Sequence, residues 1–348
     1  MSLEVTIKKK LKNMTLDVSF DTKDSSGITG ILGSSGCGKS MTLKSIAGIV
    51  TPDEGRIVLN DRVLFDSKKG INLRIQERGV GYLFQNYALF PHMTVLENVE
   101  MALKGTRAEK RELAEFYLRM FRVEELSGQY PARLSGGQQQ RVAFARVMAS
   151  KPSVLMLDEP FSALDYDLKE KLQLELLEEL KTYKGEVLLV THSRDEIYRL
   201  CSFIHVISQG SIAVSGSVKK VFEEPKTVSA ARLTGCKNIV KIEYLTSHKF
   251  YVPDWKMEVI IEGREVPKDR DYVGIRAHSL AGVWEEDETN VMECRVKRLL
   301  DDPFEVTLIL ENGIWWKLPK DIWKTEFQET APPFVKVPEE SIFFLKNQ

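Results

Sequence analysis

Short apolar runs in the first 230 residues predict buried strands that alternate with helices. The runs at residues 28–32, 154–157 and 187–190 are almost wholly apolar. Runs of this length without polar alternation are typical of strands covered on both faces of a parallel sheet. Residues 41–49, after the first run, place apolar side chains at helical spacing. The pattern therefore favours an α/β domain in this part of the chain.

The pattern changes near residue 236, where short runs of β-branched and aromatic residues replace helical spacing. In FEVTLILENGIWWKLP, residues 304–319, two such runs surround Asn312-Gly313, which predicts a β-hairpin. Further strands are expected within residues 237–245, 256–263 and 272–280, and closely spaced short strands favour a small barrel. Trp284, Trp315, Trp316 and Trp323 are expected in a core or an interface, with ligand stacking as the alternative.

Composition narrows the class of protein. The chain has 348 residues, which suggests two domains, with three as the alternative, and 43% of them are hydrophobic, enough for full cores. Its formal net charge of -1 shows no basic excess of the kind that favours a nucleic-acid partner. No apolar run reaches the roughly 18 residues of a membrane span, and the N-terminal residues lack the apolar core of a signal peptide. The four cysteines are widely spaced and are expected to be reduced thiols.

A candidate phosphate-binding loop lies between the first apolar run and the helix after it. GSSGCGKS, residues 33–40, fits the pattern G-x-x-x-x-G-K-[ST] in the required context of strand, loop and helix. Its glycines allow successive N–H groups to converge on phosphate oxygens. Lys39 can reach the β- and γ-phosphates, and Ser40 can offer its hydroxyl to Mg²⁺. The alternative, a glycine turn with an incidental lysine, is disfavoured by this context.

Two acidic residues, Asp158 and Glu159, end the second apolar run. Ligands bind beyond the carboxyl ends of parallel strands, so Asp158 is placed to hold Mg²⁺ and Glu159 to orient or deprotonate a water molecule. Two solvated carboxylates are the alternative, and the phosphate loop argues against it. The third run ends in Thr191-His192, where a lone histidine is more often structural than catalytic.

A second candidate anion site occurs in LSGGQQQR, residues 134–141. Ser135 and two glycines precede an expected helix, and a helix start offers free N–H groups and the positive end of the dipole. Ser135 can also be a simple N-cap, and both readings can hold together.

Residues 1 to about 230 resemble the ATP-binding cassette (ABC) family of transporter ATPases. The motifs occur in the family order: GSSGCGKS, Gln85 in YLFQNYALFPHMTVLENV, LSGGQ, VLMLDEP, SALD at 162–165 and His192. The resemblance implies an α/β P-loop ATPase domain over residues 1–232, with a helical subdomain at about 86–150. Residues 233–348 resemble the OB-like or TOBE-like barrel that follows the cassette in many importers.

The resemblance also implies ATP and Mg²⁺ as cofactors, and a head-to-tail dimer in which each ATP lies between the phosphate loop of one copy and the LSGGQ of the other. The implied catalytic residues are Glu159, His192 and Gln85, and the implied metal-site residues are Ser40, Gln85 and Asp158. The implied nucleotide contacts and interface residues are Gly33, Ser34, Ser35, Gly36, Cys37, Gly38, Lys39, Ser40, Met41, Ser135, Gly136, Gly137, Gln138 and Asp165.

The implied partners are a second copy, transmembrane permease subunits and, indirectly, an extracytoplasmic solute-binding protein; no nucleic acid is implied. The chain would lie peripherally on the cytoplasmic face of the membrane. The apolar cluster of Tyr87, Leu89, Phe90 and Met93 favours the segment 87–97 as the permease docking surface, against an ordinary exposed loop.

The region 55–95 and the junction TGCKNI look most like molybdate-importer ATPases, with sulfate, tungstate or another small solute as alternatives. A soluble cassette protein of DNA repair or ribosomes is disfavoured, because one cassette is present without a heptad insertion and the chain is not basic. The C-terminal domain could bind a regulatory partner, bind the solute or dimerise, and it could also make the chain an anion sensor.

Two positions depart from the family pattern. Residues 8–13 contain no aromatic residue to stack on adenine, so Leu11 is expected to pack there instead. Met41 stands where a hydroxyl residue commonly touches the α-phosphate, and only its backbone N–H remains for that contact.

Overall fold

The computed structural model describes residues 2–25, 27–162, 164, 166–181, 183–285 and 289–347. The chain divides into two compact units, Met1–Val218 and Lys219–Gln348. This division comes earlier than the boundary expected after residue 232. The reason is that α8 (Val228–Leu233) buries Val228 and Ala231 against Cys236, Phe343 and Leu345 of the C-terminal unit.

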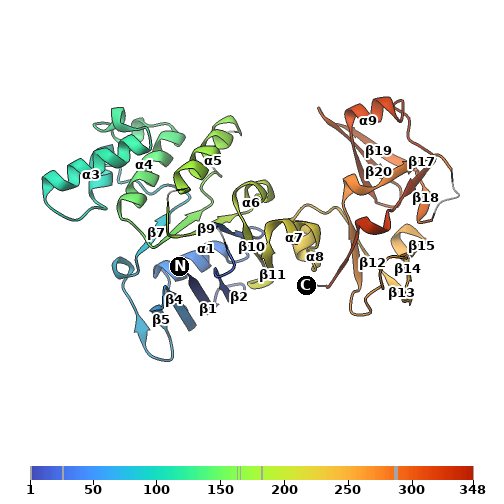
Figure 1. The fold of residues 1–348 in the computed structure, drawn as a ribbon, viewed down its shortest axis with the longest axis horizontal. Coiled ribbons are helices and arrows are strands. Elements are labelled where there is room, and N and C mark those ends of the chain that lie inside the picture. The colour runs from blue at the N-terminus through green and yellow to red at the C-terminus, as the bar shows by residue number, and fades with distance from the viewer. Residues whose placement is uncertain are drawn as a thin grey trace. The chain divides into compact units, whose positions relative to one another are not determined.

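One large mixed sheet forms the centre of the N-terminal unit (Figure 1). Its strands, in spatial order, are β6 (Ile71–Asn72), β5 (Arg62–Asp66), β4 (Glu54–Leu59), β1 (Leu3–Lys10), β2 (Thr15–Asp21), β11 (Ser211–Ser217), β10 (Phe203–Ser208), β3 (Ile28–Leu32), β9 (Glu186–Thr191), β8 (Val154–Asp158) and β7 (Val80–Leu83). The strands from β10 to β7 run parallel, and those from β6 to β2 are antiparallel.

The parallel part confirms the buried strands predicted from the apolar runs. Every residue of β3 and of β8 is buried. Because β9 lies between β3 and β8, the chain segments that follow these three strands emerge at one edge of the sheet. The phosphate loop, the Asp158-Glu159 pair and His192 follow β3, β8 and β9 in turn, so the topology gathers them together.

The helices described in the N-terminal unit are α1 (Lys39–Ala47), α2 (Val95–Glu100), α3 (Arg107–Met120), α4 (Gly136–Ala149), α5 (Tyr166–Leu180) and α6 (Arg194–Leu200). The helices α2, α3 and α4 pack on one another, within the stretch expected to form a helical subdomain. Phe121, after α3, stacks on Phe144 of α4 with ring centroids 6.0 Å apart. In Figure 1 this group lies beside β7, which α4 contacts.

The C-terminal unit is the expected β domain, built from small antiparallel sheets. The sheets are β12 (Asn238–Lys241) with β16 (Tyr272–Ile275) and β23 (Ile342–Leu345); β13 (Glu243–Thr246) with β14 (Lys249–Val252) and β15 (Met257–Ile260); β17 (Ala281–Val283) with β22 (Phe334–Lys336) and β18 (Val291–Glu293); and β19 (Val296–Asp301) with β20 (Glu305–Leu310) and β21 (Trp315–Pro319). Its helices are α7 (Val218–Glu223), α8 and α9 (Lys320–Thr325). One apolar cluster joins these sheets.

The hairpin predicted at Asn312-Gly313 is present between β20 and β21. Gly313 has a φ of +84°, which glycine adopts without strain, and its N–H donates to the Leu310 carbonyl at 3.0 Å. Trp316 and Trp323 are buried in the core as expected, whereas Trp284 is exposed.

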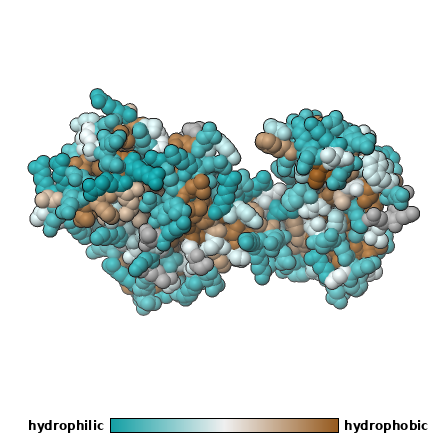
Figure 2. Space-filling view, turned by 45° about the horizontal axis from the view of Figure 1, so that its top comes forward, coloured by the Kyte–Doolittle hydropathy of each residue, from teal (hydrophilic) through white to brown (hydrophobic). Residues whose placement is uncertain are grey.

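The visible surface of both units is mostly hydrophilic, with small scattered apolar patches (Figure 2). None of the helices in the described ranges combines the length and the apolar content needed to cross a bilayer.

Candidate functional site

The phosphate loop connects β3 to α1, and two of its glycines have left-handed backbone conformations. Gly36 has a φ of +78° and Gly38 a φ of +110°. A Cβ built on Gly36 would meet no atom within 4 Å, whereas one on Gly38 would lie 2.6 Å from Leu16. Gly38 caps α1 with its backbone alone. The loop therefore needs glycine at 38 for conformation and space, and it is open to solvent at Gly36.

Lys39 folds back over this loop. Its side chain is only 4% exposed, and its Nζ donates to the carbonyls of Gly33 at 2.8 Å and Ser34 at 3.0 Å. The same Nζ lies 4.0 Å from Glu159 Oε1. A buried ammonium group held by loop carbonyls beside the start of a helix makes this loop a cationic cradle, which fits a phosphate chain.

Met41, in contrast, is partly buried and packs against the apolar core of the sheet, as does Leu11. Ser34 and Ser35 are exposed on the loop, and Cys37 is buried beneath it. Burial raises the pKa of the Cys37 thiol, so this cysteine favours its neutral form.

Asp158, at the end of β8, is held from both sides. Ser40 Oγ donates to Oδ1 at 2.8 Å, and the Tyr82 hydroxyl donates to Oδ2 at 2.7 Å. Burial, together with the bond to Asp158, raises the pKa of Tyr82 well above its usual value, so the phenol stays protonated and remains a donor. The carboxylate is thus fixed in orientation beside the phosphate loop.

Tyr82 was not among the residues expected at the site. It lies on β7, which runs parallel to β8 and pairs Tyr82 with Met156. The sequence gives little indication of this role, because an aromatic residue in a buried strand usually belongs to the core. The position three residues before Gln85, near the end of the same strand, is the only hint in the sequence that it faces the site.

Glu159 has a strained backbone and a histidine partner. Its φ of +47° lies in the left-handed region that non-glycine residues seldom occupy, and its N–H donates to the Val190 carbonyl of β9 at 2.9 Å. Glu159 Oε2 lies 3.1 Å from His192 Nδ1. The two side chains predicted from separate motifs therefore meet, beside Lys39.

Gln85 connects to Glu159 through Ser162. Its Nε2 donates to Ser162 Oγ at 3.2 Å, and Ser162 Oγ donates to the Glu159 carbonyl at 3.0 Å. Gln85 is thereby placed beside the acidic pair. Asp165 lies outside the described residues.

The LSGGQ segment forms an exposed helix start. Ser135 caps the 14-residue helix α4, its Oγ accepting from the N–H of Gln138 at 3.4 Å, while Gln138 Oε1 accepts from the N–H of Ser135 at 2.9 Å. Gly136 is exposed, and a Cβ on Gly137 would lie 2.9 Å from Leu168. Within the described part of the chain, no hydrogen bond joins Ser135 or Gln138 to the phosphate loop.

The segment after Gln85 is anchored to α4 by Arg146. Tyr87 and Ala88 both have positive φ, and their carbonyls accept from the Arg146 guanidinium at 2.9 and 2.8 Å. The guanidinium also lies 5.4 Å from the centre of the Phe90 ring. Tyr87 was expected on the surface but is buried, because this bend turns its side chain inward, whereas Phe90 is exposed.

A groove of about 470 Å³ opens beside this segment, lined among others by Phe84, Phe90, Met101, Arg146 and Val147. It lies between the end of β7 and the helices α2 and α4. Its walls are largely apolar, with one guanidinium at the edge.

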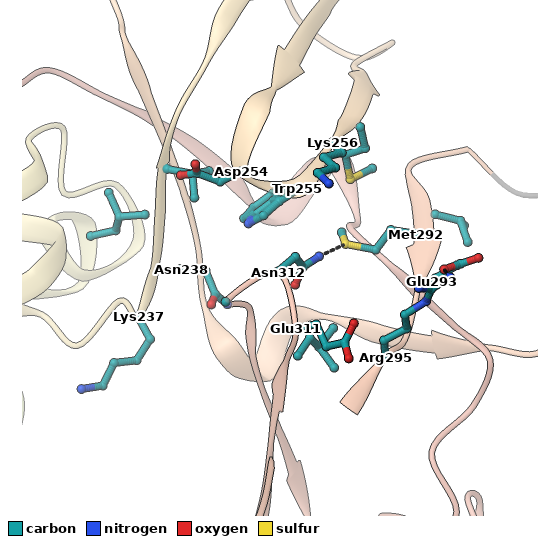
Figure 3. A pocket seen from close by; sticks show the side chains of 16 residues that line it. Lys237, Asn238, Asp254, Trp255, Lys256, Met292, Glu293, Arg295, Glu311 and Asn312 are labelled. Carbon is teal, nitrogen blue, oxygen red and sulfur yellow. Dashed lines mark hydrogen bonds and ion pairs between the residues drawn. The ribbon is translucent and has the colours of Figure 1, made fainter. Parts of the chain in front are cut away.

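The C-terminal unit has a separate cleft of about 860 Å³ (Figure 3). Asn312 lies near its centre and donates to Met292 Sδ at 3.2 Å, while Arg295 pairs with Glu293 at 2.6 Å. Lys256 and Asp254 flank the buried Trp255. Acidic and basic side chains alternate around the cleft, so its charge indicates no ligand class.

Comparisons with known proteins agree with this geometry. The family model described as ABC transporter matches residues 15–162. A molybdenum import ATP-binding protein of Mannheimia succiniciproducens is 37% identical over 266 residues, which are 76% of this chain and 73% of that protein. A spermidine/putrescine import ATP-binding protein of Oleidesulfovibrio alaskensis is 42% identical over 213 residues, 60% of this chain and 56% of its own length.

The fold is also shared with solved structures. A dimeric ATP-binding cassette in a post-hydrolysis state, bound to ADP and Pi, is 28% identical and has a TM-score of 0.53. The match covers 63% of this chain and 99% of that one. With the phosphate loop, the acidic pair and the LSGGQ helix in place, the chain belongs to the ATP-binding cassette transporter family and is an ATPase of that family.

Proposed function

We propose that this chain hydrolyses ATP to power a membrane importer. The observation that carries the proposal is the convergence of Lys39, Ser40, Asp158, Glu159 and His192 at the carboxyl ends of β3, β8 and β9. Both importer relatives support the direction of transport by their names. The chain would then act on the cytoplasmic face of the membrane, bound to permease subunits that an extracytoplasmic binding protein supplies with solute.

The donor set beside the phosphate loop fits Mg²⁺. Ser40 supplies a hydroxyl, Asp158 a carboxylate and Gln85 an amide, all oxygen ligands of the kind that this ion prefers. No group of three or more His, Cys, Asp or Glu residues suited to a metal occurs in the described ranges. That agrees with Mg²⁺ at phosphate sites, which needs one or two carboxylates beside the phosphate oxygens. The bound ion would neutralise charge that develops on those oxygens.

Glu159 would be the general base. Its Oε2 contacts His192 and its Oε1 faces Lys39, so the carboxylate is oriented before a water molecule binds. Glu159 would accept the proton of that water while Lys39 holds the phosphates. His192 would contact the γ-phosphate, and Gln85 would position the water and the ion.

Removing the Tyr82 hydroxyl should weaken metal binding. We expect Tyr82→Phe to bind Mn²⁺ about 10-fold more weakly in the ADP-loaded protein, because Asp158 loses the donor that fixes its orientation. Electron paramagnetic resonance of free Mn²⁺ measures this without turnover. The control is Tyr183→Phe, which removes a hydroxyl that donates to the Pro152 carbonyl instead. Equal Mn²⁺ affinity in the two variants would contradict the role of Tyr82.

Two copies would be needed for each complete site. Ser135 and Gly136 are exposed at the start of α4, beside the buried Gly137 and the partly buried Gln138. No hydrogen bond in the described residues links Ser135 or Gln138 to the phosphate loop of the same chain. A symmetric dimer completes two such half-sites at once. Asp165 would help to align this interface, which ATP would stabilise and hydrolysis would open.

The groove lined by Phe84, Phe90 and Met101 would receive a helix of the permease. Its apolar walls suit the apolar face of a helix, and Arg146 ties it to α4, whose start carries Ser135. Movement of the docked permease helix would therefore be transmitted through α4 to the LSGGQ segment at the start of α4.

The cargo that we propose is an oxyanion, foremost molybdate, since residues 55–95 and the junction TGCKNI resemble molybdate-importer ATPases and a molybdenum import protein is 37% identical over 76% of this chain. Spermidine or putrescine is the second candidate cargo, because a spermidine/putrescine import protein is 42% identical to this chain over a match of 213 residues. Cells that lack the chain should lose cellular molybdenum when grown at trace molybdate, and the intact chain should restore it. Elemental mass spectrometry tests this. Normal molybdenum with reduced polyamine uptake would reverse the choice.

A further inference from the structure

A small pocket lies in the N-terminal unit where the end of α3 meets α4 and α5. It has a volume of about 190 Å³, and none of its lining residues belongs to the phosphate loop or to the acidic pair. Its inner walls are the buried side chains of Phe121, Phe144, Leu172 and Leu176. Leu174, which also lines it, is 67% exposed, so the pocket reaches the surface. An apolar cavity of about 150 Å³ is enough to bind benzene, so this pocket has room for one small ring compound.

One polar side chain in the walls of this pocket lacks a hydrogen-bond partner. Gln140 of α4 is only 1% exposed, and both its Oε1 and its Nε2 are buried without a partner among the described residues. The buried Nε of Arg141 is likewise without a partner there. Buried amides are nearly always paired, because an unpaired amide has given up water without gaining a hydrogen bond. Turning the Gln140 amide toward the pocket therefore breaks no hydrogen bond, and a ligand that pairs with it would supply two.

The charged residues at the rim of the pocket favour a neutral ligand. Arg141 pairs with Glu175 at 2.9 Å, and Lys181 pairs with Glu178 at 2.7 Å. Glu175, Glu178 and Glu179 all line the pocket, so an anionic ligand would meet three carboxyl groups. A cationic ligand would compete with Arg141 for Glu175, which already has its partner. The remaining free polar group is the amide of Gln140, and it carries no charge.

We propose that this pocket binds a small neutral molecule that combines an apolar ring with one carboxamide. The ring packs among Phe121, Phe144 and Leu172, and the carboxamide forms a reciprocal pair with Gln140. In that pair Gln140 Nε2 donates to the ligand carbonyl, and the ligand N–H donates to Gln140 Oε1. The occupant contacts both α5 and α4, the helix that Ser135 caps, so it fixes the position of α4 against α5. This site is separate from the proposed nucleotide site and from the groove beside Phe90.

Titration of the full chain with benzamide, followed by NMR of ¹³C-labelled methionine methyl groups, tests the site. Met120 lines the pocket, whereas Met101 lines the groove beside Phe90 and is the internal comparison. We expect the Met120 methyl signal, assigned with Met120→Leu, to shift saturably with a Kd of about 1 mM, as suits so small a ligand. The Met101 signal should stay in place. Absence of a saturable shift at Met120 would overturn the proposal and indicate water as the occupant of the pocket.

A second variant tests the pairing with the amide. Gln140→Leu removes both unpartnered polar atoms, so it should weaken benzamide binding about 10-fold or more. Toluene, which has the ring without the amide, should bind the wild type and Gln140→Leu within about twofold of each other. The urea midpoint of unfolding should not fall, because no hydrogen bond is lost.

Gln76→Leu, the same change at an exposed position, is the matched control and should leave benzamide binding unchanged. Equal benzamide affinity in Gln140→Leu and the wild type would overturn the role of the amide. A clear loss of stability or a failure to fold in Gln140→Leu would show that Gln140 already has a partner within the chain, and this result would also overturn the proposal.

Discussion

Replacing Glu159 by glutamine will leave ATP binding intact and lower turnover by about 10²- to 10⁴-fold, the usual contribution of a general base. The amide keeps the size of the side chain and can still contact His192, which lies 3.1 Å from the carboxylate, but it cannot accept a proton from water. The steady-state rate of phosphate release measures the loss. With hydrolysis blocked, ATP should also trap the dimer that the composite sites form.

The matched control is Glu54→Gln, which makes the same change at an exposed position on β4. It should hydrolyse ATP at the wild-type rate. If Glu159→Gln kept full turnover as well, Glu159 would not be the base, and the strained backbone at φ +47° would need another explanation. A loss of ATP binding in Glu159→Gln would instead indicate damage to the phosphate loop through Lys39.

Replacing Ser135 by arginine will abolish cooperative hydrolysis while nucleotide binding to the single subunit stays unchanged. The arginine occupies the exposed start of α4, where the proposed partner site would accept the ATP of another copy. Thr106→Arg is a close control, because Thr106 caps α3, another 14-residue helix, through the same capping-box arrangement. Both changes should destabilise their helices by about 1 kcal/mol through the lost cap. Only the Ser135 variant also alters the proposed partner site, so only this variant should lose hydrolysis.

Mixing two inactive variants separates a composite site from a site within one chain. Ser135→Arg keeps its phosphate loop, and Lys39→Ala keeps its LSGGQ segment. A mixed dimer contains one complete composite site, so activity should return on mixing. If each chain completed its own site, the mixture would stay inactive. A fall in nucleotide affinity of monomeric Ser135→Arg would also contradict the composite arrangement.

Much of the site could be predicted from sequence because its residues follow buried parallel strands. Apolar runs identify such strands, and the carboxyl ends of neighbouring strands share one edge of the sheet. The contacts of Ser40 with Asp158 and of Glu159 with His192 follow from that topology. Gln85 meets Ser162 for a similar reason, since β7 runs beside β8.

Other features depend on contacts between segments far apart in the chain. Tyr82 donates to Asp158 only because β7 and β8 are neighbours, and Arg146 reaches the Tyr87 carbonyl from a helix 59 residues later. The burial of Tyr87 depends on a bend with two positive φ values, and the local sequence does not predict this bend. From sequence alone, an apolar residue in a loop is predicted to be exposed, and only the packing of that loop shows whether it is buried.

Local sequence pattern and turn chemistry suffice to predict the strand-loop-helix order, the phosphate loop, the acidic pair and the hairpin at Asn312-Gly313. The packing of α8 on the C-terminal unit, the contact of Tyr82 with Asp158 and the position of β19 at the edge of its sheet depend on the tertiary structure. These depend on which strands become neighbours and which surfaces stay uncovered. Burial and hydrogen bonding over the whole fold determine which strands become neighbours. No local segment of sequence carries that information alone.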